Sequence, residues 1–513
     1  MLARLGIGCA CALALLSCSK PYTDEKVSES IALASSFSKQ LDSSLESTRD
    51  TDTPSTFAQS LLTLIDDESL RALLDMALAN NTNILTLTSQ IAQAREALGL
   101  ASANMLPKLS INMGYNYSSG NYNRYQININ QNTLNANLSL SWELDLFGKL
   151  NMLRKSKKYD YLATLSNLSV AQVSLIGEVA SNYYAYKRIT NAARLQEQML
   201  NNYGRILDTL RHKHDLGLID ITILSDTIAA LNAAKSAHSS LLLEQEKMKN
   251  ALIVLLNTSD TQALTLLLNG SELESKAQSL ESSLDSTALS ALDSSLPSIK
   301  LPSINALPKD ILLSRDDVRA SIASLNAQVM LKNSKKAALF PSLSLGGNLG
   351  QILFSSRGVG DLIWSITGSL ASPLINRSAL TKDYKIQKES VKQAFYALES
   401  TLRTALGEIE NAITEVNTAQ SSLQAKEQVL STSQEVWLAA RTRYELGLLD
   451  ESSYLTSYNA LLSARQSVDE ARFARLSSVI VLYKALGGKL AVEHQAKHTN
   501  ERALDSSNNL LKG

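Results

Sequence analysis

Two aspartates at matching positions are the residues of this chain that could most directly do chemistry. Asp220 follows Gly217 by three residues in HDLGLID, and Asp450 follows Gly447 by three residues in YELGLLD. Carboxylates that lie close together attract cations and repel one another at neutral pH. Alternatively, each aspartate caps the helix that follows it by accepting hydrogen bonds from free backbone amides. The two roles are compatible, so the sequence leaves both open.

The N-terminus offers a different chemistry, covalent modification by lipid. Arg4 precedes an apolar stretch at 5–16, and Ser17 stands directly before Cys18. A charged start, a short apolar stretch and a small residue at the cleavage site are typical of a secretory signal. Because Leu-Leu-Ser-Cys resembles the bacterial lipobox, we expect removal of residues 1–17 and attachment of lipids, palmitate among them, to Cys18. A plain signal peptide cleaved elsewhere is the alternative.

No pattern of an enzyme, cofactor or metal site stands out. His212 and His214 are two residues apart on an expected helix, so they point to different faces. All three cysteines lie at or before the predicted cleavage site, which excludes disulfides and cysteine-metal sites from the mature chain. The glycine-rich segment 346–350 lies in a strand context and lacks the lysine of a phosphate-binding loop. We therefore predict a non-enzyme without cofactor or metal.

The two aspartates belong to two tandem repeats. Three landmarks recur in the same order: Pro107 and Pro341 at an offset of 234 residues, Leu146 and Leu374 at 228, and Gly217 and Gly447 at 230. So constant an offset indicates a duplication in which each half is one structural unit.

Long helices are expected in both repeats. Residues 151–217 form a continuous helix-forming pattern without proline, with apolar residues at spacings of three and four. At 1.5 Å per residue, such a helix spans roughly 100 Å, far more than a globular core. Residues 218–257 then run back, and 391–446 and 448–486 repeat the arrangement. The pattern indicates a coiled coil or a helical array.

Strands with one apolar and one polar face precede the helices. Residues 109–117 and 134–146 alternate strictly, and weaker alternation begins at Leu343 and Leu362. Apolar faces of about ten residues suit a transmembrane β-barrel, whose lumen is polar. A soluble sheet packed on helices is the alternative. Beyond the signal we expect no apolar run of about 18 residues, and therefore no transmembrane helix.

One chain has too few strands to close a barrel. Each repeat supplies two strands, whereas the smallest transmembrane barrels use about eight. An open sheet edge in lipid leaves backbone groups unsatisfied. Several chains must therefore share one barrel, with eight strands from two chains or twelve from three. The sequence does not choose between these numbers.

Charge is balanced over the chain but not along it. The 49 basic and 49 acidic residues cancel, so no global field favours nucleic acid. Basic residues nevertheless gather after the strands of both repeats. They are Lys149, Arg154, Lys155, Lys157, Lys158, Lys382, Lys385 and Lys388. This group would lie against anionic lipid headgroups, or it is an ordinary solvated helix start.

The motifs together resemble the TolC-like outer-membrane efflux channels, in their lipid-anchored branch, over about residues 60–490. The resemblance is carried by SWELDLFGKL and HDLGL in the first half and by FPSLSL, YELGL and LYKALGG in the second, in that order along the chain. It implies a mostly helical fold with a membrane β part, built of two repeats that each hold a strand pair and a long helical hairpin. It also implies a homotrimer with a twelve-stranded β-barrel and an α-helical barrel, which docks a periplasmic adaptor and an inner-membrane pump.

The resemblance assigns roles to the hairpin tips. It implies that Leu216, Gly217, Leu218, Leu446, Gly447 and Leu448 contact the adaptor. Family gates hold acids six and nine residues after the second tip glycine, where this chain has Ser453 and Thr456; the first tip has Asp226 nine residues on. Asp220 and Asp450 are substitute candidates. Tyr444 matches an aromatic gate residue, although its usual arginine partner is replaced by Leu449.

The domain organisation follows from these assignments. We predict a signal peptide at 1–17, a lipid-anchored extended tether at 18–60, repeats at 61–269 and 309–490, an equatorial segment at 270–308, and a polar tail at 491–513. Ser19 after the lipidated cysteine is compatible with the outer membrane. The expected function is an outer-membrane exit duct of a tripartite efflux or secretion system, extending into the periplasm. A lipid-tethered periplasmic coiled-coil scaffold without a pore is the alternative.

Overall fold

The computed structural model divides into two compact units. It describes residues 20–31, 57–65, 67–122, 127–261, 264–265, 268, 296–297, 299, 308–355, 358–373 and 375–489. The first unit takes its residues from 1–32, 87–167 and 317–402, and the second from 33–86, 168–316 and 403–513. Each unit therefore contains segments of both repeats.

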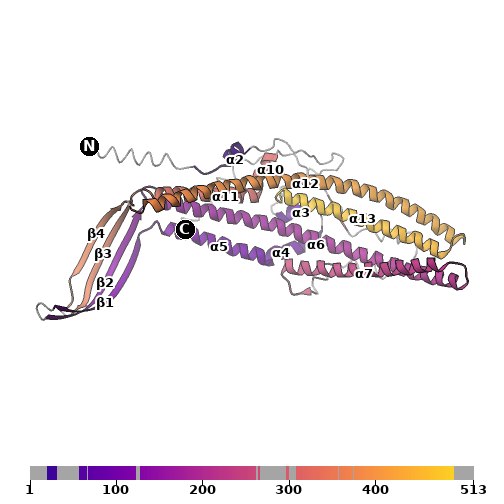
Figure 1. Ribbon diagram of the computed structural model, residues 1–513, viewed down its shortest axis with the longest axis horizontal. Coiled ribbons are helices and arrows are strands. Elements are labelled where there is room, and N and C mark those ends of the chain that lie inside the picture. The colour runs from indigo at the N-terminus through magenta and orange to yellow at the C-terminus, as the bar shows by residue number, and fades with distance from the viewer. Residues whose placement is uncertain are drawn as a thin grey trace. The chain divides into compact units, whose positions relative to one another are not determined.

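The first unit holds a four-stranded antiparallel sheet in the order β1-β2-β3-β4 (Figure 1). The strands are β1 (Lys108–Tyr122), β2 (Ile127–Leu144), β3 (Ser342–Ser355) and β4 (Leu362–Ala371). The two strand pairs expected from the two repeats are both present, and β2 joins them by pairing with β3. β1 and β4 are the two edges of this sheet.

The register gives the sheet one apolar and one polar face. Leu138 pairs with Ile111 on one side and with Leu349 on the other, and Leu349 pairs with Trp364. The opposite face carries serine, asparagine, threonine and glycine, and the Ser110 and Ser139 hydroxyls lie 2.7 Å apart there. Because side chains alternate along a strand, this register places these apolar residues on one side, whereas Ile363, paired with Gly350, lies on the other.

The apolar face is exposed. All ten residues of β4 are exposed, Trp364 and Ile366 among them, and Leu109 and Ile111 on β1 are exposed as well. The alternative of a soluble sheet packed on helices is therefore not what the chain forms. An exposed apolar face of this extent requires lipid or another protein to cover it.

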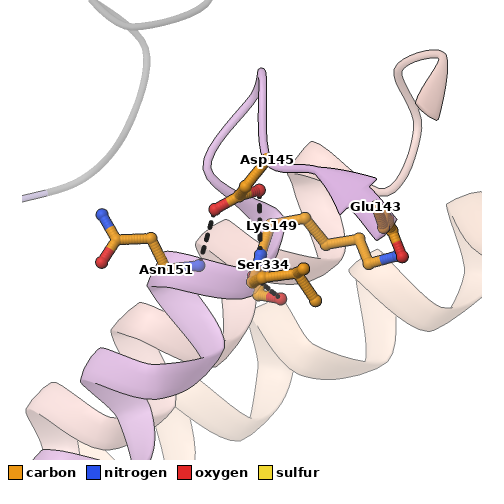
Figure 2. A network of polar contacts seen from close by, with 6 residues as sticks. Glu143, Asp145, Lys149, Asn151 and Ser334 are labelled. Atoms are coloured by element: carbon orange, nitrogen blue, oxygen red, sulfur yellow. Dashed lines mark hydrogen bonds and ion pairs between the residues drawn. The ribbon is translucent and has the colours of Figure 1, made fainter. Parts of the chain in front are cut away.

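A polar network fixes the passage from β2 into α6 (Lys149–Asp215), as Figure 2 shows. Asp145 accepts hydrogen bonds from the backbone N–H groups of Leu150, at 3.0 Å, and Asn151, at 2.7 Å. Lys149 forms an ion pair with Glu143 at 2.6 Å, and the Ser334 hydroxyl donates to the Lys149 carbonyl oxygen. These bonds satisfy amides that a helix start leaves free.

Ser334 belongs to α11 (Asp316–Ala337) of the second repeat. The Phe147 and Phe340 rings, one from each repeat, stack at a centroid distance of 5.0 Å beside this network. The two repeats therefore meet where the strands become helices. α12 (Arg377–Glu445) continues from β4 in the second repeat, and α5 (Thr82–Ala103) precedes β1 in the first.

α6 and α12 begin in the first unit and continue into the second. There α6 and α7 (Ile221–Leu256) form one antiparallel hairpin, and α12 and α13 (Glu451–Ala485) form the other (Figure 1). α6 and α12 have 67 and 69 residues, which confirms the expected long helices. The shorter helices are α3 (Phe57–Leu64), α4 (Glu68–Asn80) and α10 (Pro308–Ser314). Asn81, after α4, donates from Nδ2 to the Leu255 carbonyl oxygen at the end of α7.

Buried polar pairs join α6 to α13 within an apolar seam. Asn202 donates from Nδ2 to the Asn459 Oδ1 at 2.7 Å, and Asn191 donates to the Asp469 carboxylate. Burial raises the pKa of Asp469. A buried polar group is stable only with its partner in place, so these pairs specify one register of α6 against α13.

The N-terminal segment differs from the expected extended tether over residues 20–31. This stretch contains α2 (Asp24–Ser30), whose Val27 side chain is fully buried. The Tyr22 N–H donates to Asn326 Oδ1 at 2.6 Å, and Asn326 Nδ2 donates back to the Tyr22 carbonyl oxygen at 2.9 Å. Cys18, most of the segment at 270–308 and the tail at 491–513 lie outside the described residues.

One correction concerns apolar stretches. Among the described helices, α6 includes 18 residues with a mean hydropathy of 1.2, long and apolar enough to cross a membrane by length and composition alone. This stretch differs from the prediction that no such run follows the signal. A third of this stretch is buried, and core helices share its length and composition, so these two properties do not by themselves make it a membrane span.

The two-faced sheet leads to a first prediction. If its apolar face meets lipid, Leu140→Arg places a charge in hydrocarbon at a cost of about 2–4 kcal/mol and lowers the amount of protein in the outer-membrane fraction. Ser139→Arg, on the polar face, is the matched control and should be retained at the normal level. Equal loss of both variants would mean that the two faces are assigned wrongly.

Candidate functional site at the hairpin tips

The two hairpins end in the same turn. Gly217 and Gly447 adopt φ values of +70° and +69°, in the left-handed region that favours glycine. The Leu218 N–H donates to the Lys213 carbonyl oxygen, and the Leu448 N–H donates to that of Arg443, both at 2.8 Å. These bonds satisfy the last carbonyls of α6 and α12, as in other glycine-terminated helices. The tip glycines thus lie where the sequence placed them.

Each turn presents two exposed leucines. Leu216 and Leu218 are 73% and 68% exposed, and Leu446 and Leu448 are each 68% exposed. A side chain added at either glycine would meet no atom within 4 Å, so the turns are open on that side. Exposed pairs of leucines at equivalent positions on two helix ends form apolar surfaces that suit contact with another protein.

The two duplicated aspartates have different partners. Asp220 caps α7, because its Oδ1 accepts a hydrogen bond from the Thr222 N–H at 2.8 Å and another from the Thr222 hydroxyl. These bonds lower its pKa. Asp450 makes no side-chain hydrogen bond to a helix amide, and its Oδ2 instead accepts one from the Lys213 ammonium group at 2.6 Å. Its hydrogen bonds to Lys213, and secondarily to serines, hold its pKa well below the usual range.

Two ion pairs join the hairpins. Lys213 and Arg205 on α6 contact Asp450 and Glu451 at the start of α13. Both basic residues lie on one face of α6, because a spacing of eight is close to two helical turns. An apolar cluster of Ile206, Leu210 and Leu455 packs beside these pairs. The sequence analysis missed Lys213, Arg205 and Glu451, although the basic pair spaced by eight could have indicated them.

The remaining candidates lie apart from these ion pairs. Tyr444 stacks on Tyr454 within its own hairpin, with ring centroids 4.9 Å apart and an angle of 8° between the planes. Asp226 lies on the exposed side of α7. Within the described ranges, no group of three or more histidine, cysteine or acidic residues could hold a metal ion, and His212 and His214 belong to no such group.

Comparison with known proteins gives the family. The family model described as outer membrane efflux protein matches residues 73–258 and 307–488. The chain is 27% identical to the probable efflux pump outer membrane protein TtgC of Pseudomonas putida, over 82% of this chain and 83% of TtgC. It is 25% identical to the cation efflux system protein CusC of Escherichia coli, over 83% of this chain and 87% of CusC.

Solved structures show the same fold. A membrane protein from Pseudomonas aeruginosa aligns with a TM-score of 0.71 and 21% identity, over 91% of this chain and 99% of that one. The CmeC outer membrane channel of Campylobacter jejuni aligns with a TM-score of 0.71 and 21% identity, over 92% of this chain and 96% of that one.

The Lys213–Asp450 pair leads to a second prediction. A double-mutant cycle with Lys213→Met and Asp450→Asn should give a coupling free energy below about 1 kcal/mol at pH 7, because exposed pairs are screened by water. These side chains are 32% and 39% exposed. The measurement is the opening free energy of amides 450–455 by hydrogen exchange. The matched control is the Arg211–Asp208 pair within α6, which should show no coupling to these amides.

The pH dependence of this coupling has a defined sign. The folded-state pKa of Asp450 is lowered, so its contribution is fully present above the unfolded value of about 3.9 and is lost as the pH falls through the lower folded value. Coupling should therefore stay constant from pH 8 to pH 5. A loss of coupling between pH 7 and pH 5 would show that Asp450 is not the group involved.

Proposed function

Because the chain belongs to the outer membrane efflux protein family, we propose that it is the outer-membrane exit duct of a tripartite efflux system, a passive channel for drugs or other small molecules. The observation that carries this proposal is the sheet, which exposes an apolar face and leaves two edges open. The relatives' names include efflux pumps for toluene, solvents and antibiotics and a cation efflux system, which supports small molecules as cargo.

We propose that three chains share one barrel. Twelve strands then close the open edges, because β4 of one chain pairs with β1 of the next and every backbone group in lipid finds a partner. The apolar face meets lipid and the serine- and asparagine-rich face lines the lumen. The long hairpins of three chains supply twelve helical segments for a tube that extends into the periplasm.

The lipid anchor is part of the proposal. Cys18 precedes Tyr22 by four residues, which span at most about 14 Å in extended form. Tyr22 is bonded to Asn326 on α11, in the unit that holds the sheet. An acyl chain on Cys18 would therefore insert into the membrane close to the start of α2, which supports attachment to the outer membrane in addition to the strands.

The tips are the proposed docking surface for a periplasmic adaptor, which connects the duct to an inner-membrane pump. Leu216, Leu218, Leu446 and Leu448 are exposed, apolar and held on helix ends by glycine turns. The repetition of one turn on both hairpins supports two similar docking sites in each chain.

The ion pairs between the hairpins are the proposed lock of the periplasmic end. Lys213–Asp450 and Arg205–Glu451 hold the start of α13 against the end of α6. To widen the opening, the second hairpin would have to move away from the first, which breaks both pairs. Asp220, Asp226 and Tyr444 remain gate candidates, of which Asp220 and Tyr444 stabilise the hairpins themselves.

The docking proposal predicts a loss of export without a loss of assembly. Leu216→Asp combined with Leu446→Asp should abolish dye efflux from cells, because charged tips cannot bury against an adaptor. Light scattering of the detergent-extracted complex, corrected for detergent, should still give three chains. Leu216→Met with Leu446→Met keeps the apolar surface and should export normally. Monomers in the wild type would reject the shared barrel, and normal efflux by the Asp variant would reject docking at the tips.

The lock proposal predicts a change in conductance. Asp450→Asn removes the charge that holds Lys213, so the reconstituted channel should spend more time open in planar bilayers. Asp208→Asn removes a more exposed acid, 71% against 39% for Asp450, whose described ion pair is with Arg211 within α6, and it should leave the open fraction unchanged. An unchanged open fraction in Asp450→Asn would mean that this pair does not lock the opening.

A further inference from the structure

A dense band of basic residues lies where the strands become helices. We define the basic collar as residues 149–158, 332–336 and 377–392, all within the first unit. It contains thirteen basic and two acidic residues, a net charge of +11 in a chain whose formal net charge is zero. The collar combines segments of both repeats, at the start of α6, the end of α11 and the start of α12.

The collar begins where the charge-free surface of the sheet ends. β3 and β4 contain no charged residue, and β1 and β2 contain only Lys108 and Glu143, at the end next to the helices. An apolar surface bordered by a positive band matches the cross-section of a bilayer leaflet, with hydrocarbon first and phosphate groups next.

Helix electrostatics makes this arrangement unfavourable without an anion. α6 and α12 both begin in the collar, and neither has an acidic residue in its first turn. The N-terminal end of a helix carries partial positive charge, so cations placed there are repelled and anions are attracted. Asp145 caps α6, and Glu143 and Asp160 pair with Lys149 and Lys157, which leaves the other three of the five basic residues at 149–158 without an ion pair in the described part of the chain.

Internal ion pairs neutralise only part of the collar. Lys149, Lys157, Lys335 and Lys392 each have a carboxylate within 4 Å. For Lys155, Lys382, Lys385 and Lys388, no ion pair exists among the described residues, and all four are exposed. The last three follow one another at a spacing of three along one side of α12.

Exposed apolar side chains lie among the free lysines. Ile375 is exposed just before α12, Ile386 is exposed next to Lys385 in the chain, and Tyr396 is exposed ten residues further along α12. Lysine stems together with aliphatic and tyrosine side chains are the composition found at membrane–water interfaces.

We propose that the basic collar binds the anionic headgroups of phospholipids, in the leaflet that the sheet reaches on its helical side. Lys155, Lys382, Lys385 and Lys388 are the contacts, and their ammonium groups bind the lipid phosphates while Ile375, between β4 and these α12 lysines in the chain, lies at the acyl boundary. This inference rests on the proposed function, because it requires the sheet to lie in the membrane.

The test is lipid binding by the intact complex purified from outer membranes in neutral detergent. Native mass spectrometry with added phosphatidylglycerol gives an apparent Kd, and phosphatidylcholine gives the background. A variant with Lys155, Lys382, Lys385 and Lys388 all changed to glutamine should bind phosphatidylglycerol at least tenfold more weakly. Changing the same residues to arginine should preserve binding, which separates loss of charge from misfolding.

The matched control removes the same charge elsewhere. Lys235, Lys247, Lys249 and Lys426 lie on α7 and α12 of the second unit. Their joint change to glutamine should leave the apparent Kd within twofold of the wild type. Two outcomes would overturn the proposal. Equally weakened phosphatidylglycerol binding in both variants would show non-specific charge attraction. Full competition by millimolar inorganic phosphate would show a simple phosphate site.

Two further measurements on the same samples separate the possible failures. If the collar variant binds phosphatidylglycerol normally but changes the reversal potential of the channel, these lysines line the duct and the proposal is wrong. If the wild-type protein is monomeric and absent from the outer-membrane fraction, the proposed function itself is rejected. Unchanged lipid binding in a trimer that exports normally would reject the collar alone.

Discussion

In hydrocarbon, a backbone N–H or carbonyl group without a partner has no water to bind, and each such group costs several kcal/mol. This constraint governs the whole molecule. β1 and β4 are edges of a sheet with only four strands, and the chain contains no strand to pair with either of them in the described residues. The apolar face of the same sheet is exposed, so the edges cannot be hidden in a soluble core. The proposed barrel shared by several copies satisfies the edges and the face together.

The long helices pack in one fixed register. α6 and α12 are too long to enclose a globular core, and they pack along a seam with α7 and α13. Apolar side chains alone would allow such helices to slide by one turn, since each turn offers a similar surface. The Asn202–Asn459 and Asn191–Asp469 pairs remove that freedom, because a slide would leave buried polar groups without partners. The positions of the tips therefore depend on contacts several turns away.

The two tips show how a duplicated motif acquires two functions. Their backbones are nearly identical, with the same glycine conformation and the same closing hydrogen bonds. Their aspartates differ, because Thr222 follows Asp220 with an N–H and a hydroxyl within reach, whereas Lys213 from the other hairpin reaches Asp450. One carboxylate thus stabilises its own helix, and the other links two hairpins.

The sequence by itself determined the repeats, the long helices, the two-faced strands and the family, because periodicity and turn glycines are local properties of the chain. It also located Gly217 and Gly447 at the reversals. It could not choose between capping and pairing for Asp220 and Asp450, and it missed Arg205, Lys213 and Glu451. It described residues 20–31 as an extended tether, whereas Val27 is buried and Tyr22 is bonded to Asn326. Apart from the local Asp220–Thr222 cap, these outcomes depend on contacts such as Lys213–Asp450 and Tyr22–Asn326, whose residues are more than 200 positions apart and are brought within hydrogen-bond distance only by the tertiary structure.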